Sequence, residues 1–182
     1  MTKIYFAGPL FSQADLRYNA YLVEQIRQLD KTIDLYSPQE NAAINDKSAY
    51  ADSKMIALAD TENVLASDLL VALLDGPTID AGVASEIGVA YAKGIPVVAL
   101  YTDSRQQGAD NHQKLDALNE VAENQFHYLN LYTVGLIKLN GRVVSSEEIC
   151  WKKLSNDCHN KKERANSLVL FLYFFYRFIF KN

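Results

Sequence analysis

Two short apolar runs flank a glycine- and alanine-rich stretch in the middle of the chain. The runs cover Leu69 to Leu74 and Ile95 to Tyr101. Apolar runs of this length between turn residues are typical of strands buried on both faces of a parallel sheet. The stretch between them, Gly82 to Lys93, has the apolar spacing of a helix and ends at Gly94, a residue that commonly terminates helices. The pattern therefore predicts strand, loop, helix and strand in succession.

The same patterns continue on both sides of this central unit. Further strands are predicted at Lys3 to Ala7, Ile33 to Tyr36 and Arg142 to Val144, and helices at Leu10 to Leu29, Tyr50 to Ala66 and, within a polar loop, Gln113 to Val121. Leu129 to Leu139 is an apolar segment of unassigned type that ends in a tight turn at Asn140-Gly141. Strands that alternate with helices indicate an α/β fold. We expect a Rossmann-like (flavodoxin-like) parallel sheet of about five strands with helices on both faces.

Bulk properties narrow the class of protein. The length of 182 residues suits one domain with a sizeable core, and the net charge of -4 argues against nonspecific binding to nucleic acid, so small molecules are the favoured partners. Cys150 and Cys158 form no zinc-binding pattern, and we expect neither a disulfide nor a metal ion. The N-terminal segment lacks the apolar core of a secretory signal, which favours a cytoplasmic protein with no membrane association.

The composition changes near the end of the chain. From Ile149 the sequence is rich in Lys and Asn and then almost entirely aliphatic and aromatic, and the apolar part, Leu168 to Phe180, contains Arg177 and is shorter than the roughly 20 residues that span a bilayer. We therefore divide the chain into a domain of residues 1–148 and an atypical extension of residues 149–182. The extension either packs against a partner or is non-native, such as a frameshifted end of the gene, and the abrupt shift in composition favours the second interpretation.

Several carboxylates follow the predicted strands. In open parallel sheets ligands bind at the carboxyl ends of the strands, which places Asp75, Asp80 and Glu86 near one crevice, and Asp60 could point toward the same strand ends. Asp80 could serve only as a helix cap and Asp75 only as a turn former. Glu86 differs because its neighbours indicate a buried helix, where a charge is costly and an ionisable group is often functional. The helix start would favour its ionised form.

Carboxylates that converge on a crevice indicate chemistry at a glycosidic centre. One carboxylate would stabilise or capture an oxocarbenium-like sugar, while another group would handle the proton of the leaving group. The phenol of Tyr5, in the first strand, could orient a carboxylate, and packing in the core is the equal alternative.

Three segments together resemble the nucleoside 2-deoxyribosyltransferase family. They are IYFAGPLF near the N-terminus, the spacing of Asp60, Asp68, Asp80 and Glu86 with the sequence DAGVASEIGVAYAKG, and LNLY at residues 129–132. The resemblance covers roughly residues 3–148, and the segment from Asp80 to Gly94 is its most specific part. It implies a Rossmann-like enzyme of nucleoside salvage, a pentosyltransferase that moves 2-deoxyribose between nucleobases without a cofactor.

The resemblance also implies roles for individual residues. Glu86 would attack C1′ and form a covalent deoxyribosyl enzyme, Tyr5 would hold Glu86 in position, and Asp60 and Asp80 would contact the base and shuttle a proton. Asn130 would bind sugar hydroxyls across a subunit interface and Tyr132 would shape the neighbouring wall. The remaining expected substrate-binding residues are Gln39, Phe11, Gly8 and Gly82. The substrates would be 2′-deoxynucleosides and free nucleobases, and the assembly a homo-oligomer, dimer-based and up to hexameric.

Two other functions remain open at the level of sequence. The first is an N-glycosidase that hydrolyses 2-deoxynucleoside 5′-monophosphates, which would need a phosphate cradle near Gly8. Pro9 removes an amide donor there and two apolar residues follow, which disfavours such a cradle. The second is a non-catalytic nucleotide-sensing domain that keeps the fold.

Overall fold

A five-stranded parallel sheet forms the centre of the protein. The computed structural model describes residues 1–45, 50–159 and 161. The strands are β1 (Thr2–Ala7), β2 (Ile33–Tyr36), β3 (Leu69–Leu73), β4 (Val97–Leu100) and β5 (Gly141–Val144). They lie in the order β2-β1-β3-β4-β5, and every pair is parallel. This is the flavodoxin-like order, so the predicted fold class is confirmed.

Helices connect the strands on both faces. They are α1 (Gln13–Leu29), α2 (Ala42–Asn45), α3 (Ser53–Leu65), α4 (Ala81–Lys93), α5 (His112–Asp116) and α6 (Leu131–Leu139), with short 3₁₀ turns at Pro38–Glu40, Ser104–Gln106 and Ala117–Asn119. Residues 147–159 are also helical. The unassigned apolar segment is thus a helix, and Asn140-Gly141 leads into a strand parallel to β4.

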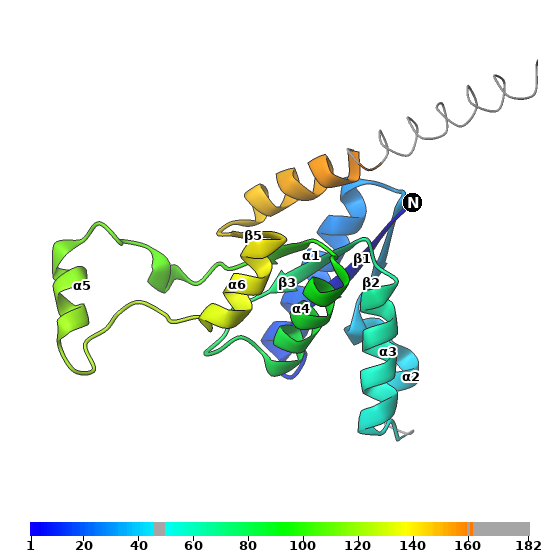
Figure 1. The fold of residues 1–182 in the computed structure, drawn as a ribbon, viewed down its shortest axis with the longest axis horizontal. Helices are drawn as coiled ribbons and strands as arrows, with labels where there is room; N and C mark the ends of the chain where they lie inside the picture. The colour runs from blue at the N-terminus through cyan, green and yellow to red at the C-terminus, as the bar shows by residue number, and fades with distance from the viewer. Residues whose placement is uncertain (46–49, 160, 162–182) are drawn as a thin grey trace, which may run out of the picture.

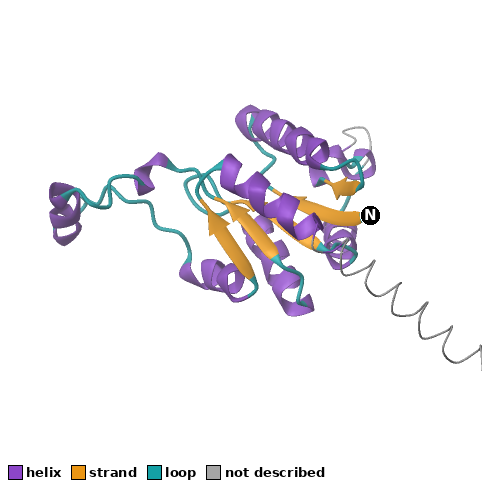
Figure 2. Cartoon of the chain, turned by 90° about the horizontal axis from the view of Figure 1, so that it is seen from above, coloured by secondary structure: helices purple, strands orange, loops and turns teal. Residues whose placement is uncertain are grey.

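Successive side chains of each strand point to opposite faces of the sheet, and this divides the core into two layers. Ile4 and Phe6 of β1 face α1 and helix 147–159, whereas Tyr5 and Ala7 face the layer of α3, α4 and α6. Helices therefore cover both faces of the sheet (Figures 1 and 2). Gly94 has φ 76° and ends α4 in the left-handed conformation, as the sequence predicted. The alternation therefore directs Tyr5 and Ala7 of β1 toward α4.

The helix that follows β5 packs on the sheet. Cys150, Leu154 and Cys158 are buried, and Trp151 packs against the same layer. Residues 149–159 of the predicted extension thus contribute to the core, while residues 160 and 162–182 lie outside the described part of the chain. Among the helices that the structure describes, none combines the length and apolar character that crossing a bilayer requires.

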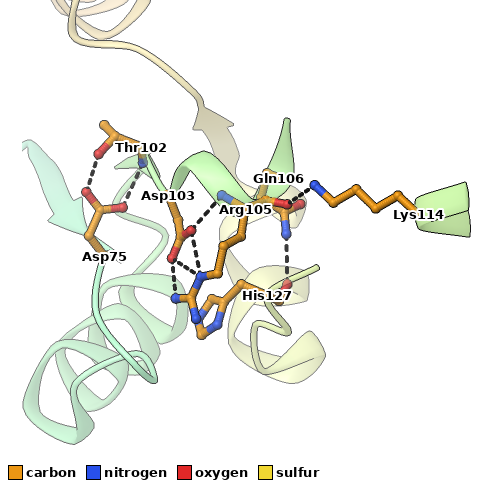
Figure 3. Close-up of polar contacts among 7 residues, drawn as sticks. All are labelled: Asp75, Thr102, Asp103, Arg105, Gln106, Lys114 and His127. Carbon is orange, nitrogen blue, oxygen red and sulfur yellow. Dashed lines mark hydrogen bonds and ion pairs between the residues drawn. The ribbon is translucent and has the colours of Figure 1, made fainter. Parts of the chain in front are cut away.

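The segment between β4 and α6 extends outward from the sheet and carries α5 at its far end (Figures 1 and 2). Polar contacts cross-link the segment (Figure 3). Gln106 donates to the carbonyl of His127 at 2.8 Å, and Lys114 Nζ donates to the carbonyl of Arg105 at 3.0 Å. The same ammonium lies 4.5 Å from the ring centroid of Phe126. These contacts join the outgoing and returning parts of the segment.

Candidate functional site

A cavity of about 380 Å³ opens at the carboxyl ends of β1 and β2, beside the start of α4. Three carboxylates, Asp60, Asp80 and Glu86, line it together. Apolar side chains form much of the remaining wall: Leu10, Phe11, Pro38, Ile44, Ile56 and Val83. The position agrees with the rule that ligands bind beyond the carboxyl ends of parallel strands. An apolar cavity with a few convergent polar groups suits a small organic ligand.

Gly8, Phe11 and Gly82, which the sequence marked as substrate-binding candidates, all line this cavity. Phe11 is 81% exposed, so its ring lies at the mouth. A Cβ on Gly8 would come within 2.8 Å of Asn19 Oδ1, and Asn19 is itself buried and donates to the Pro9 carbonyl. A side chain at position 8 would therefore force Asn19 to shift where the chain turns out of β1.

The central contact of the cavity joins β1 to α4. Tyr5 is fully buried, and its hydroxyl donates to Glu86 Oε1 at 2.6 Å. Tyr5 points toward α4 because of the alternation along β1, and Glu86 points toward Tyr5 from the second turn of α4. One carboxylate oxygen of Glu86 is thereby fixed. The other, Oε2, accepts no hydrogen bond from the described residues, and it belongs to a side chain that lines the cavity.

Burial raises the pKa of Glu86 to about 7. The hydrogen bond from Tyr5 lowers this pKa, and the charges of Asp60 and Asp80 raise it further. The sequence-based expectation that the helix start favours the ionised form is not met, because Glu86 is the sixth residue of α4 and the dipole effect fades within the first turn. Near neutral pH, comparable fractions of the protonated and ionised forms are present.

Asp80 and Asp60 approach Glu86 from two different helices. Asp80 is the N-cap of α4, and its Oδ1 accepts from the amides of Gly82 at 2.9 Å and Val83 at 3.1 Å. Asp80 therefore both caps the helix and lines the cavity. Asp60 lies on α3, and burial raises its pKa, against a lowering contribution from the Tyr5 hydroxyl. The burial of Asp60 therefore favours its protonated, donating form.

The comparisons with known proteins identify the family. The family model for nucleoside 2-deoxyribosyltransferase matches residues 4–121. The chain belongs to this family. The match confirms the resemblance carried by the N-terminal motif and the segment around Glu86. Comparison with curated proteins gives no match.

Solved structures share the fold of this chain. A conserved protein from Enterococcus faecalis V583 is 93% identical over 86% of this chain and 99% of its own, with a TM-score of 0.83. A 2-desoxiribosyltransferase from Leishmania mexicana is 20% identical, covers 86% of this chain and 98% of its own, and has a TM-score of 0.59. The second likeness is one of fold.

Three of the residues that the family resemblance singled out do not line the cavity of their own chain. Gln39 donates to the carbonyl of Leu16 at 3.0 Å, because the 3₁₀ turn at Pro38–Glu40 directs it toward α1. Asn130 caps α6 by accepting from the amide of Thr133 at 3.1 Å. Tyr132 is 76% exposed and borders a separate hollow beside α4. The structure thus separates these residues from Glu86.

Asp75 is also separate from the cavity, contrary to its expected place in the crevice. Its carboxylate accepts from the Thr102 amide at 2.7 Å and from the Thr102 hydroxyl, which ties the end of β3 to the end of β4 (Figure 3). Asp68 directly precedes β3 and therefore lies at the amino ends of the strands, where it accepts from the amide of Lys3 and pairs with Lys161. Both carboxylates have partners within the chain.

Two polar residues of the cavity are not among the candidates that the sequence suggested. Tyr36 ends β2 and Asn41 follows the 3₁₀ turn, and both line the cavity. The register of the sheet places Tyr36 directly beside Tyr5, with ring centroids 5.5 Å apart. A signal was available, since an aromatic residue at the carboxyl end of a strand next to β1 occupies the ligand-binding edge. The shortness of β2 and its mixed polarity weakened that signal.

Proposed function

We propose that this protein transfers 2-deoxyribose between nucleobases through a covalent 2-deoxyribosyl ester of Glu86, as an enzyme of nucleoside salvage in the cytoplasm. The observation that supports it most strongly is the Tyr5 hydroxyl 2.6 Å from Glu86 Oε1, inside a cavity that Asp60 and Asp80 share. A fixed carboxylate with a second carboxyl group nearby suits a double displacement at an anomeric carbon.

In the first step the ionised Glu86 attacks C1′ of a 2′-deoxynucleoside. The C1′–N bond breaks as the C1′–O bond to Glu86 forms, and the departing base nitrogen receives a proton from Asp60. The raised pKa of Asp60 suits a proton donor, and the carboxylates around the sugar stabilise positive charge that develops at C1′. Loss of one base leaves a deoxyribosyl ester with inverted configuration and an ionised Asp60.

In the second step a different base enters the cavity. Its nitrogen attacks C1′, the ester bond to Glu86 breaks, and Asp60 accepts the proton that the nitrogen loses. Two inversions give net retention. Water would hydrolyse the ester. The apolar wall that includes Phe11, Ile44 and Ile56 would keep water away from it. Neither step requires a metal ion or a cofactor.

The charge of the cavity favours transfer between neutral nucleosides over cleavage of nucleoside monophosphates. Asp60, Asp80 and Glu86 place three carboxyl groups around the ligand, and each ionised one repels a phosphate dianion. A phosphate cradle would be needed at the position of Gly8, Leu10 and Phe11, and Leu10 and Phe11 present apolar side chains to the cavity there. These features favour a neutral sugar with a nucleobase as the ligand.

We further propose that the enzyme is a homo-oligomer whose site is completed by a neighbouring subunit. The outer face of α4 is made of small residues, among them Ala84, Gly88 and Ala92, and it borders a hollow with Tyr91 and Tyr132. Leu131 and Leu139 of α6 are 83% and 70% exposed. A largely apolar helix surface of this kind suits contact with another subunit, which would bring Asn130 of one copy toward the sugar bound by the other.

Incubation of the protein with thymidine and adenine tests the proposed reaction. We expect 2′-deoxyadenosine and thymine to appear in equal amounts, because the deoxyribosyl ester passes to the second base. The products are quantified by liquid chromatography. Free deoxyribose without base exchange would favour a hydrolase, and binding of nucleoside without turnover would favour a sensing domain.

Replacement of Asp60 by asparagine tests its role as proton donor. We expect D60N to lower the rate of exchange by about 10²- to 10⁴-fold, the range typical of a general acid. The loss should shrink for nucleosides whose base leaves readily without protonation, which steady-state rates on a series of modified bases would reveal. The matched control is E62Q, which changes an exposed carboxylate on the same helix. A uniform loss across the series would argue against proton donation.

A further inference from the structure

The end of β2 presents a phenol to the cavity. Tyr36 lines the cavity and packs its ring against Tyr5, with centroids 5.5 Å apart and planes 31° apart. The two residues are partners in the register of parallel strands β1 and β2, so their side chains leave the sheet on the same face. The register of the sheet thus places the Tyr36 ring beside Tyr5, the residue that donates to Glu86.

The direction of the Tyr36 hydroxyl is set by Asn41. The Oδ1 atom of Asn41 accepts from the amide of Ala43 at 3.1 Å, with a longer contact to the amide of Ile44. Because backbone amides are donors only, this side of the Asn41 side chain must be its oxygen, and Nδ2 is the atom 2.9 Å from the Tyr36 hydroxyl. Asn41 therefore donates, and the hydroxyl oxygen of Tyr36 accepts.

This arrangement leaves the proton of Tyr36 for another acceptor. A phenol that accepts from one side still has one O–H to donate. Burial raises the pKa of Tyr36, and the charges of Asp60 and Glu86 add to the effect, so the phenol keeps its proton through the neutral range. Among the described residues, none accepts a hydrogen bond from the Tyr36 hydroxyl.

We propose that the Tyr36 hydroxyl, oriented by Asn41, donates a hydrogen bond to an acceptor atom of the bound nucleobase, a carbonyl oxygen or an unprotonated ring nitrogen. The wall formed by residues 36–44 contributes Pro38 and Ile44, whose apolar surfaces suit a flat heteroaromatic ring. The carboxylates of the cavity accept from the donor atoms of a base, and Tyr36 supplies the complementary donor. This inference rests on the proposed function, because it assigns a specificity contact within the same site.

Two substitutions that change one functional group each test the inference. Y36F removes the hydroxyl and keeps the ring against Tyr5. N41D keeps an oxygen for the Ala43 amide but replaces the donor with an acceptor, so the Tyr36 proton is drawn to the new carboxylate and away from the base. We expect each variant to bind free nucleobase about 5- to 100-fold more weakly, the range for loss of one hydrogen bond to a buried acceptor. The double variant should be little worse than either single one.

The experiment combines calorimetric titration of free adenine and thymine with steady-state kinetics. KM for the acceptor base should rise while kcat changes little, because the contact exists before and during the reaction. Y21F is the matched control, since the hydroxyl of Tyr21 donates to Glu147 at 2.9 Å, outside the cavity lining. A structural role for Asn41 alone would leave the affinity of N41D unchanged, because aspartate caps such a turn equally well.

The outcomes separate this inference from the proposed function. If the wild-type protein exchanges bases and Y36F or N41D binds them with unchanged affinity, the inference is wrong and the function stands. If the wild-type protein binds bases without exchange and both variants bind more weakly, the specificity contact stands and the transfer reaction fails. Strongly additive losses in the double variant would contradict the chain of donors from Asn41 through Tyr36 to the base.

Discussion

Replacement of Glu86 by alanine is expected to abolish base exchange, with a loss of at least about 10⁴-fold, because removal of a covalent nucleophile takes away the intermediate itself. The loss should appear at every pH. Mass spectrometry of the protein mixed with deoxynucleoside should detect an adduct of one deoxyribosyl group on wild type and none on E86A. The cavity keeps its apolar walls and Asp60 in this variant, so nucleoside binding should persist.

The matched control for E86A is E62A, which removes an exposed glutamate from α3 and should leave exchange unchanged. Stability supplies a second readout. The pKa of Glu86 is raised to about 7 from 4.5, so ionised Glu86 disfavours folding above pH 7, and this penalty disappears below about pH 4.5. E86A removes this penalty, but it also leaves the buried Tyr5 hydroxyl without its acceptor at every pH. The melting temperature of E86A minus that of wild type should therefore be higher at pH 8 than at pH 5, by about 2 to 4 °C for each kcal/mol of penalty relieved. Near-normal exchange by E86A would refute the nucleophile assignment.

The fold could be predicted because its main determinants are local. The runs that became β3 and β4 are apolar at every position, which a sheet covered on both faces requires, and Gly94 ends the helix between them. The connection of Asp80 to that helix was also local, since an N-cap lies directly before the first helical turn. Those features depend only on residues that are close together in the sequence, so they can be recognised without the structure.

The chemistry of the site depended on contacts that no local pattern contains. Burial raises the pKa of Glu86, and the hydrogen bond from Tyr5, 81 residues away in sequence, opposes that effect. Gln39 turned toward α1 because a 3₁₀ turn replaced the expected loop. Asn130 is a helix cap within its own chain. A role in the cavity of another copy would depend on how the subunits assemble, and no short sequence pattern predicts that assembly.

The hydrogen bond from Tyr5 to Glu86 provides a graded test of the same mechanism. In wild type, the rising limb of the pH profile of kcat/KM should have its midpoint at about pH 7, because Glu86 must lose its proton to attack C1′, and the profile should fall where Asp60, the proton donor, loses its own proton. Y5F removes the donor that lowers the pKa of Glu86 and leaves the burial that raises it. The midpoint should therefore move to higher pH.

The size of this shift follows from the strength of the bond that is lost. A hydrogen bond to a charged group contributes about 1.5 to 3 kcal/mol, and one pH unit corresponds to about 1.4 kcal/mol, so Y5F should move the midpoint upward by about 1 to 2 units. At about pH 6.5 the variant would be roughly 8- to 80-fold slower than wild type, and this ratio would shrink as the pH rises toward the new midpoint. Y18F is the control, since the hydroxyl of Tyr18 donates to Glu147 outside the cavity lining. A midpoint that stays in place while activity falls equally at every pH would mean that Tyr5 positions Glu86 without tuning its charge, and a downward shift would contradict the ionised-nucleophile mechanism.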